Sequence, residues 1–150
     1  MKLDQLQSED YVKLLLLGES GMGKTCLAAG FPTPIKIFDF DMKASSAAKF
    51  YSADKERLAN IEVEQYGHLP IKERMAKFLA DVKTIEQLQH SGKPLPFKTL
   101  VLDSLTTLVN SILEDYKKVS QLGIKRALAD VNAMQDYQLL QIHLTQLITG

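Results

Sequence analysis

Cysteine, net charge and long apolar runs are all scarce in this chain of 150 residues. The single cysteine, Cys26, cannot form an internal disulfide, which fits a reducing compartment. Basic and acidic residues number 18 each, and the zero net charge argues against coating nucleic acid by bulk charge. The longest strongly apolar run, Leu14 to Leu17, is far too short to span a bilayer. Residues 1–10 lack the basic start and apolar stretch of a secretory signal, so we expect a cytoplasmic protein without membrane contact.

The order of apolar patterns along the chain predicts an α/β fold. No repeat, low-complexity tract or Gly/Ser linker divides the sequence, so we expect one domain over residues 1–150. Short apolar stretches predict strands, the first of them buried on both faces, over residues 11–17, 35–39, 61–65 and 99–103. Helical spacing or capping signals predict helices over residues 24–29, 44–50, 70–90, 105–116 and 131–148. Strands alternating with helices indicate a mostly parallel sheet.

A phosphate-binding loop follows the first predicted strand. The pattern G-x-x-x-x-G-K-[ST] is matched in full by Gly18, Glu19, Ser20, Gly21, Met22, Gly23, Lys24 and Thr25. Glycines let the backbone wrap around phosphates, and successive N–H groups then point at the anion. Lys24 supplies charge to the β and γ phosphates, and the Thr25 hydroxyl is a ligand suited to Mg²⁺. We therefore predict that residues 18–25 and the adjoining Cys26 bind a nucleotide; otherwise the stretch is a Gly-rich turn.

Acidic residues end two of the predicted strands. Asp103 ends the strand over residues 99–103 and is expected to complete the magnesium shell, with a helix cap as the alternative and Ser104 as the other candidate cap. Asp39 ends the strand over residues 35–39 and Asp41 lies two residues beyond it, and by alternation they face the same way. Either acid could position the attacking water, or could cap the helix over residues 44–50. We favour Asp41 as the catalytic acid because it lies farther out of the sheet.

The order of these features resembles the core of RecA-like ATPases. The closer likeness is to phage-encoded RecA-like ATPases of single-strand annealing and recombination, also called phage nucleotide-binding AAA proteins. It covers nearly the whole chain and rests on KLLLLGESGMGKTCLAAGFPTPIKIFDFD, TLVLDSLTTL and MQDYQLL. The resemblance implies a P-loop NTPase with a RecA-like three-layer sandwich, using ATP and Mg²⁺. It also implies that Asp41 activates water and that Asp103 is the Walker B aspartate, so that Lys24, Asp41 and Asp103 form the catalytic set.

The resemblance also predicts a further core strand after the last helix, lying between the phosphate-loop strand and the Walker B strand. The sequence ends at Gly150, where that strand would begin. The expected fold is therefore a C-terminally truncated core. Either the sequence is a fragment, or the two strands meet in another way.

A basic stretch between the last two predicted helices is a candidate contact for single-stranded DNA. In RecA-like recombinases a loop at this place touches the strand, and here it carries Lys117, Lys118, Lys125 and Arg126. The stretch has no aromatic side chain to stack a base, which favours the alternative, a solvated helix end. We expect a homo-oligomeric ATPase acting on single-stranded DNA, in the host cytoplasm if phage-encoded. Two alternatives are a P-loop kinase or other NTPase acting on a small molecule, and a nucleotide-binding assembly module without turnover of its own.

Overall fold

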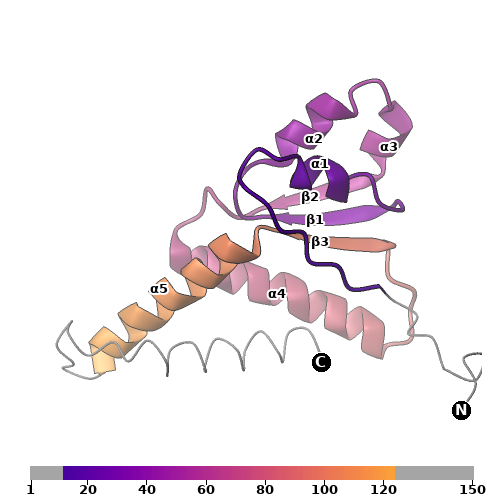
Figure 1. Ribbon diagram of the computed structural model, residues 1–150. Coiled ribbons are helices and arrows are strands. Elements are labelled where there is room, and N and C mark those ends of the chain that lie inside the picture. The colour runs from indigo at the N-terminus through magenta and orange to yellow at the C-terminus, as the bar shows by residue number, and fades with distance from the viewer. Residues whose placement is uncertain (1–11, 124–150) are drawn as a thin grey trace, which may run out of the picture.

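The computed structural model describes residues 12–123, which form a small α/β unit around a parallel sheet (Figure 1). The sheet has three strands in the order β2-β1-β3. They are β1 (Ile35–Asp39), β2 (Ile61–Gln65) and β3 (Thr99–Asp103). Each coincides with a strand predicted from the sequence. Because all three run parallel, their carboxyl ends lie at one edge of the sheet.

Helices cover both faces of the sheet (Figure 1). One side carries α1 (Lys24–Ala28), α2 (Ala44–Phe50) and α3 (Lys55–Ala59), and the other carries α4 (Ile71–His90) and α5 (Leu105–Gly123). The prediction missed α3, a single short turn that begins at the side-chain cap of Asp54. In residues 12–123, no helix is long and apolar enough to cross a membrane.

Successive side chains of β1 point to opposite faces of the sheet and therefore pack in two different layers. Phe38, with Phe40 just beyond the strand, packs toward α4 and α5, and the Phe40 ring stacks on Tyr66 with centroids 4.7 Å apart. The other face of β1 carries Ile35 and Ile37, and both are fully buried. Small residues on α1 and α2 bring these helices close to that face: Ala28, Ala29, Ala44 and Ala47.

Polar contacts hold the turn after β2 against α4. The Tyr66 hydroxyl donates to Asp81 Oδ2 at 2.6 Å, and burial together with this acceptor raises the pKa of Tyr66 well above its usual value. The Arg74 guanidinium donates to the backbone carbonyls of Tyr66, Gly67 and Leu69 at 3.0–3.1 Å. One side chain therefore satisfies the carbonyls of a whole turn.

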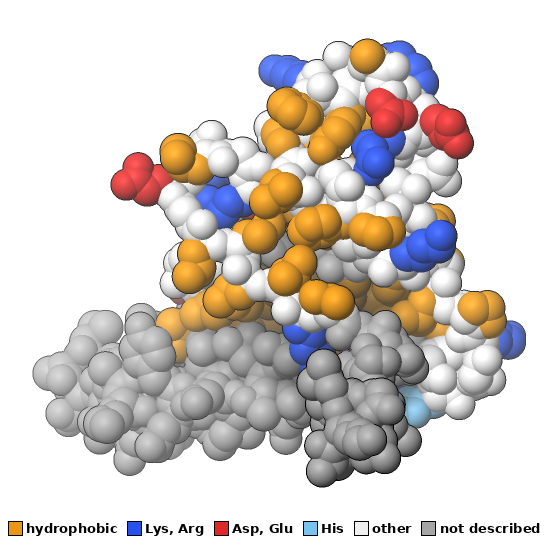
Figure 2. Space-filling view, turned by 45° about the vertical axis from the view of Figure 1, so that its right-hand side comes forward, with side chains coloured by type: hydrophobic (Ala, Val, Ile, Leu, Met, Phe, Trp, Pro, Cys, Tyr) orange, Lys and Arg blue, Asp and Glu red, His pale blue; other side chains and the backbone are white. Residues whose placement is uncertain are grey.

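The strand predicted over residues 11–17 is wrong for the residues that the structure describes. Residues 12–17 form no strand, and Val12, Leu14, Leu15 and Leu17 are each more than 60% exposed. A strand needs a neighbour for its backbone groups, and β3 pairs only with β1 in residues 12–123. The apolar pattern reflects a tendency toward burial, but it does not show whether a neighbouring strand is present to pair with this stretch. Figure 2 shows apolar side chains gathered across one face of the molecule.

The helix after β3 is longer than predicted. It was expected over residues 105–116, and α5 runs on to Gly123. The additional residues include no proline and are mostly fair helix formers, which allows the helix to continue through them. Part of the basic stretch expected to be a loop is therefore helical, with Lys117 and Lys118 in α5. Lys125, Arg126 and the helix predicted over residues 131–148 lie outside the described residues.

Asp39 ends β1, and its side chain binds the start of α2. Its side chain is fully buried, and its carboxylate accepts from the backbone N–H groups of Lys43 at 3.1 Å and Ala44 at 2.9 Å. A buried carboxylate needs such donors, and the first N–H groups of a helix lack partners within the helix. Asp39 is therefore the acid that caps the helix over residues 44–50. Of the two roles weighed from the sequence, a helix cap and a water-positioning acid, Asp39 has the first.

We predict that Asp39→Ala lowers the free energy of unfolding by about 2 kcal/mol, because it leaves buried N–H groups without acceptors. Asp39→Asn should lose less, since it keeps an acceptor oxygen. Urea denaturation measures both variants. The matched control is Asp54→Ala, an exposed cap worth about 1 kcal/mol. A loss at Asp39 no larger than at Asp54 would contradict the structural role of the buried carboxylate.

Candidate nucleotide-binding site

The predicted phosphate loop is an open turn leading into α1. Residues 18–23 are exposed, whereas Lys24, Thr25 and Cys26 are partly buried. Gly21 and Gly23 have φ values of 85° and 82°, a conformation that side chains disfavour. A Cβ at either position would meet nothing within 4 Å, so backbone conformation, not space, requires glycine there.

Lys24 lies folded onto its own loop. Its Nζ donates to the Gly18 carbonyl at 2.8 Å and to the Glu19 carbonyl at 2.7 Å. These bonds bring the ammonium group back from α1 to the start of the loop. A phosphate bound within the loop would lie next to the Lys24 ammonium group, as the motif predicts.

Thr25, at the start of α1, contacts Asp103, at the end of β3. The Thr25 hydroxyl donates to Asp103 Oδ2 at 2.5 Å, joining residues 78 positions apart in the chain. Capping of α5 belongs to Ser104, whose Oγ accepts from the Thr107 N–H at 3.3 Å. The alternative interpretation of Asp103 as the helix cap is therefore wrong. The Asp103 carboxylate faces the phosphate loop.

Asp41 lies near the loop but has a different environment from Asp39. The Thr107 hydroxyl donates to Asp41 Oδ1, and Lys43 Nζ lies 3.6 Å from Asp41 Oδ2. The Asp41 side chain is 19% exposed, so water can reach it, whereas the Asp39 side chain is fully buried. Of the two acids weighed from the sequence, Asp41 is the one available to a ligand.

Two side chains that the sequence analysis missed fasten α1 and the residues after it to the neighbouring helices. The Tyr51 hydroxyl donates to the Cys26 carbonyl at 3.2 Å, and the Arg57 guanidinium donates to the Ala29 and Phe31 carbonyls at 3.1 Å each. They satisfy carbonyls at the end of a very short helix. No motif marks these residues, because each acts through a contact that is remote in sequence.

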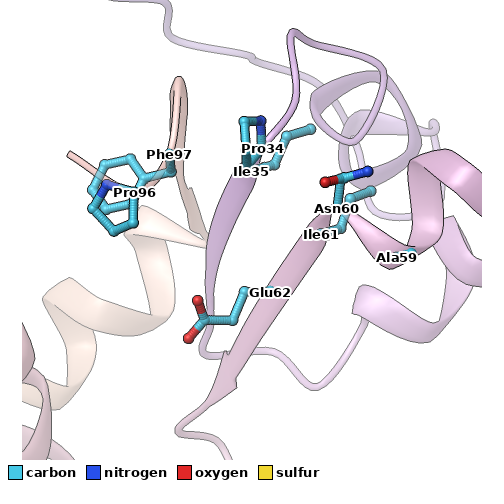
Figure 3. A pocket seen from close by; sticks show the side chains of 8 residues that line it. All are labelled: Pro34, Ile35, Ala59, Asn60, Ile61, Glu62, Pro96 and Phe97. Atoms are coloured by element: carbon cyan, nitrogen blue, oxygen red, sulfur yellow. The ribbon is translucent and has the colours of Figure 1, made fainter. Parts of the chain in front are cut away.

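The hollow drawn in Figure 3 lies elsewhere. It is formed where the strands begin, between Pro34, Asn60 and Phe97, at the edge opposite the carboxyl ends of the strands. Among the described residues that line it, Glu62 alone is charged. The hollow therefore adds nothing to the phosphate site, which is an exposed loop above the sheet.

The residues beside the loop fit a magnesium ion held together with phosphates. Mg²⁺ prefers hard oxygen ligands and takes few of them from the protein when phosphates supply the rest. Thr25 Oγ1 and Asp103 Oδ2 are such oxygens and already lie in contact. Within residues 12–123 no cluster of three or more His, Cys, Asp or Glu residues could hold a metal without such help.

We predict that Asp103→Asn reduces the affinity for Mg²⁺ in the presence of ATP by about tenfold to a hundredfold, the usual cost of disturbing the groups around a metal. Titration of ATP with and without Mg²⁺ measures the effect. The control is Asp54→Asn, which keeps a competent cap far along the chain from the loop. An unchanged magnesium dependence in Asp103→Asn would remove this residue from the site.

The chain matches one protein-family model over most of its length. The family model described as "AAA domain" matches residues 10–150, which include the phosphate loop, Asp41 and Asp103. No curated protein and no solved structure matched the chain. Since the matched region covers nearly the whole sequence, the chain belongs to the AAA domain family of P-loop nucleotide-binding proteins.

Proposed function

We propose that this protein hydrolyses ATP at the phosphate loop, with Asp41 activating the attacking water. The observation that carries the proposal is the 2.5 Å contact between Thr25 Oγ1 and Asp103 Oδ2. It joins the end of the loop to the end of β3, as a magnesium-nucleotide site requires. Membership in the AAA domain family supports the same chemistry.

Each residue has a distinct task in this proposal. The loop amides and Lys24 bind the phosphates, and Thr25 and Asp103 would hold the magnesium ion. Bound Mg²⁺ would neutralise charge that develops on the phosphates. Asp41 accepts a proton from water as the water oxygen bonds to the terminal phosphorus, and the bond to the ADP oxygen breaks. Asp39 takes no part, since its carboxylate is buried beneath α2.

We predict that one substitution prevents ATP binding and that another slows hydrolysis without weakening binding. Lys24→Ala should abolish ATP binding while the fold survives, because the side chain contacts only the loop. Asp41→Asn should bind ATP normally but hydrolyse it about a hundredfold more slowly, the scale of losing a positioned base. Release of phosphate and binding of a fluorescent ATP analogue measure the two effects. Native hydrolysis by Asp41→Asn would place the base elsewhere, and tight binding by Lys24→Ala would refute the loop assignment.

The same assay separates the two rival functions. A P-loop kinase would transfer phosphate to an added acceptor rather than to water. A nucleotide-binding assembly module would bind ATP and release no phosphate on its own. The exposed apolar residues over 12–17 favour the assembly module as the second candidate, because contiguous apolar surface commonly marks a contact between proteins.

The finer proposal is that the ATPase is a homo-oligomeric, RecA-like phage protein acting in recombination or annealing of single-stranded DNA. Its support is the resemblance of the motifs and the basic residues that follow the Walker B strand. The phosphate backbone of DNA attracts such residues whatever the base sequence.

We predict that neutralising Lys117, Lys118, Lys125 and Arg126 together lowers the salt dependence of single-stranded DNA binding. Losing about four phosphate contacts should reduce the slope of log affinity against log salt by about three units. Filter binding over a range of salt concentrations measures the slope, and ATP binding serves as the control. An unchanged slope would leave these residues as a solvated helix end.

A further inference from the structure

Lys43 brings a second ammonium group to the phosphate loop. Its Nζ lies 3.2 Å from Ser20 Oγ and 3.6 Å from Asp41 Oδ2, and its side chain is 54% exposed. Lys24 contacts the two preceding residues of the same loop, Gly18 and Glu19. Two lysines from different elements therefore contact consecutive positions of one phosphate-binding turn.

The backbone of Lys43 is fixed although its side chain is free to turn. Asp39 accepts from the Lys43 N–H at 3.1 Å, which anchors the residue at the start of α2. Beyond that anchor, the partners of the ammonium group within the described part of the chain are a neutral hydroxyl and a carboxylate at the limit of an ion pair. Both are weak partners for a partly exposed charge, whereas a phosphate oxygen would give a charge-assisted hydrogen bond.

The position of Lys43 beside Asp41 indicates which phosphate it reaches. On the proposed function, Asp41 faces the water that attacks the terminal phosphorus. A lysine 3.6 Å from that carboxylate lies next to the same phosphate. Thr25 and Asp103, by contrast, serve the metal at the other end of the loop motif.

We propose that Lys43 binds the terminal phosphate of ATP and releases Asp41 when it does so. Without the phosphate, the ammonium group lies between Ser20 and Asp41, so that a carboxylate oxygen of Asp41 faces the ammonium group rather than the attacking water. With the phosphate bound, Asp41 keeps only the hydrogen bond from Thr107. Lys43 would thus distinguish ATP from ADP and couple that distinction to hydrolysis. This inference rests on the proposed function.

The test compares ATP and ADP binding by Lys43→Met in the full chain. A non-hydrolysable ATP analogue should bind about tenfold or more weakly, because one charged hydrogen bond is lost. ADP affinity should change less than about twofold, since ADP lacks the phosphate in question. Lys43→Arg should restore most of the preference for the analogue. Lys49→Met, an exposed lysine in the last turn of the same helix, is the matched control and should bind both nucleotides normally.

Three results would overturn the inference. Equal weakening of both nucleotides would make Lys43 a general contributor to affinity, and unchanged affinity for both would leave it as a surface ion pair with Asp41. In either case Lys24→Ala still abolishes binding, and the proposed function stands. If the native chain binds neither nucleotide, the proposed function fails together with the inference.

Discussion

The buried carboxylate of Asp39 sets the geometry on which the candidate site depends. A carboxylate buried at the end of a strand must have donors close by, and among residues 12–123 its donors are the N–H groups of Lys43 and Ala44 at the start of α2. The chain must therefore turn back within a few residues of β1. That forced turn contains Met42 at a positive φ of 59°, and it carries Asp41 and Lys43 on either side. Asp41 and Lys43, the two residues of this turn that lie beside the phosphate loop, are thus positioned by a carboxylate that is fully buried.

The phosphate loop is held in place from its far end. In residues 12–123, the segment before the loop belongs to no strand, so the sheet does not fix it. The helix after the loop is fixed instead, by Tyr51 from the end of α2 and Arg57 from α3. The Thr25 bond to Asp103 adds a link to the sheet itself. The contacts that fix the loop therefore lie at the end that leads into α1. This arrangement suits a turn that must adapt to a phosphate.

Local patterns predicted the elements that local chemistry decides. The strands β1, β2 and β3 and the helix α4 carry their apolar spacing within a few residues, and the motif over residues 18–25 is contiguous. What escaped prediction depends on partners remote in sequence. The strand expected at 11–17 needed a neighbour, and the roles of Asp39 and Asp41 depended on where α2 begins. Lys43 belongs to no motif, and only the folded turn brings it to Ser20.

The register of the sheet has a consequence for how the protein folds. Asp39 pairs with Asp103, and the Phe40 N–H donates to the Asp103 carbonyl at 2.6 Å. A slip of β3 by one residue would turn Asp103 to the opposite face, and a slip by two would carry it about 7 Å along the strand. Either error separates Asp103 from Thr25. A ligand that needs both oxygens together would bind only the correctly paired sheet and would stabilise it by mass action. A bound nucleotide would then favour the correct strand register while the protein folds.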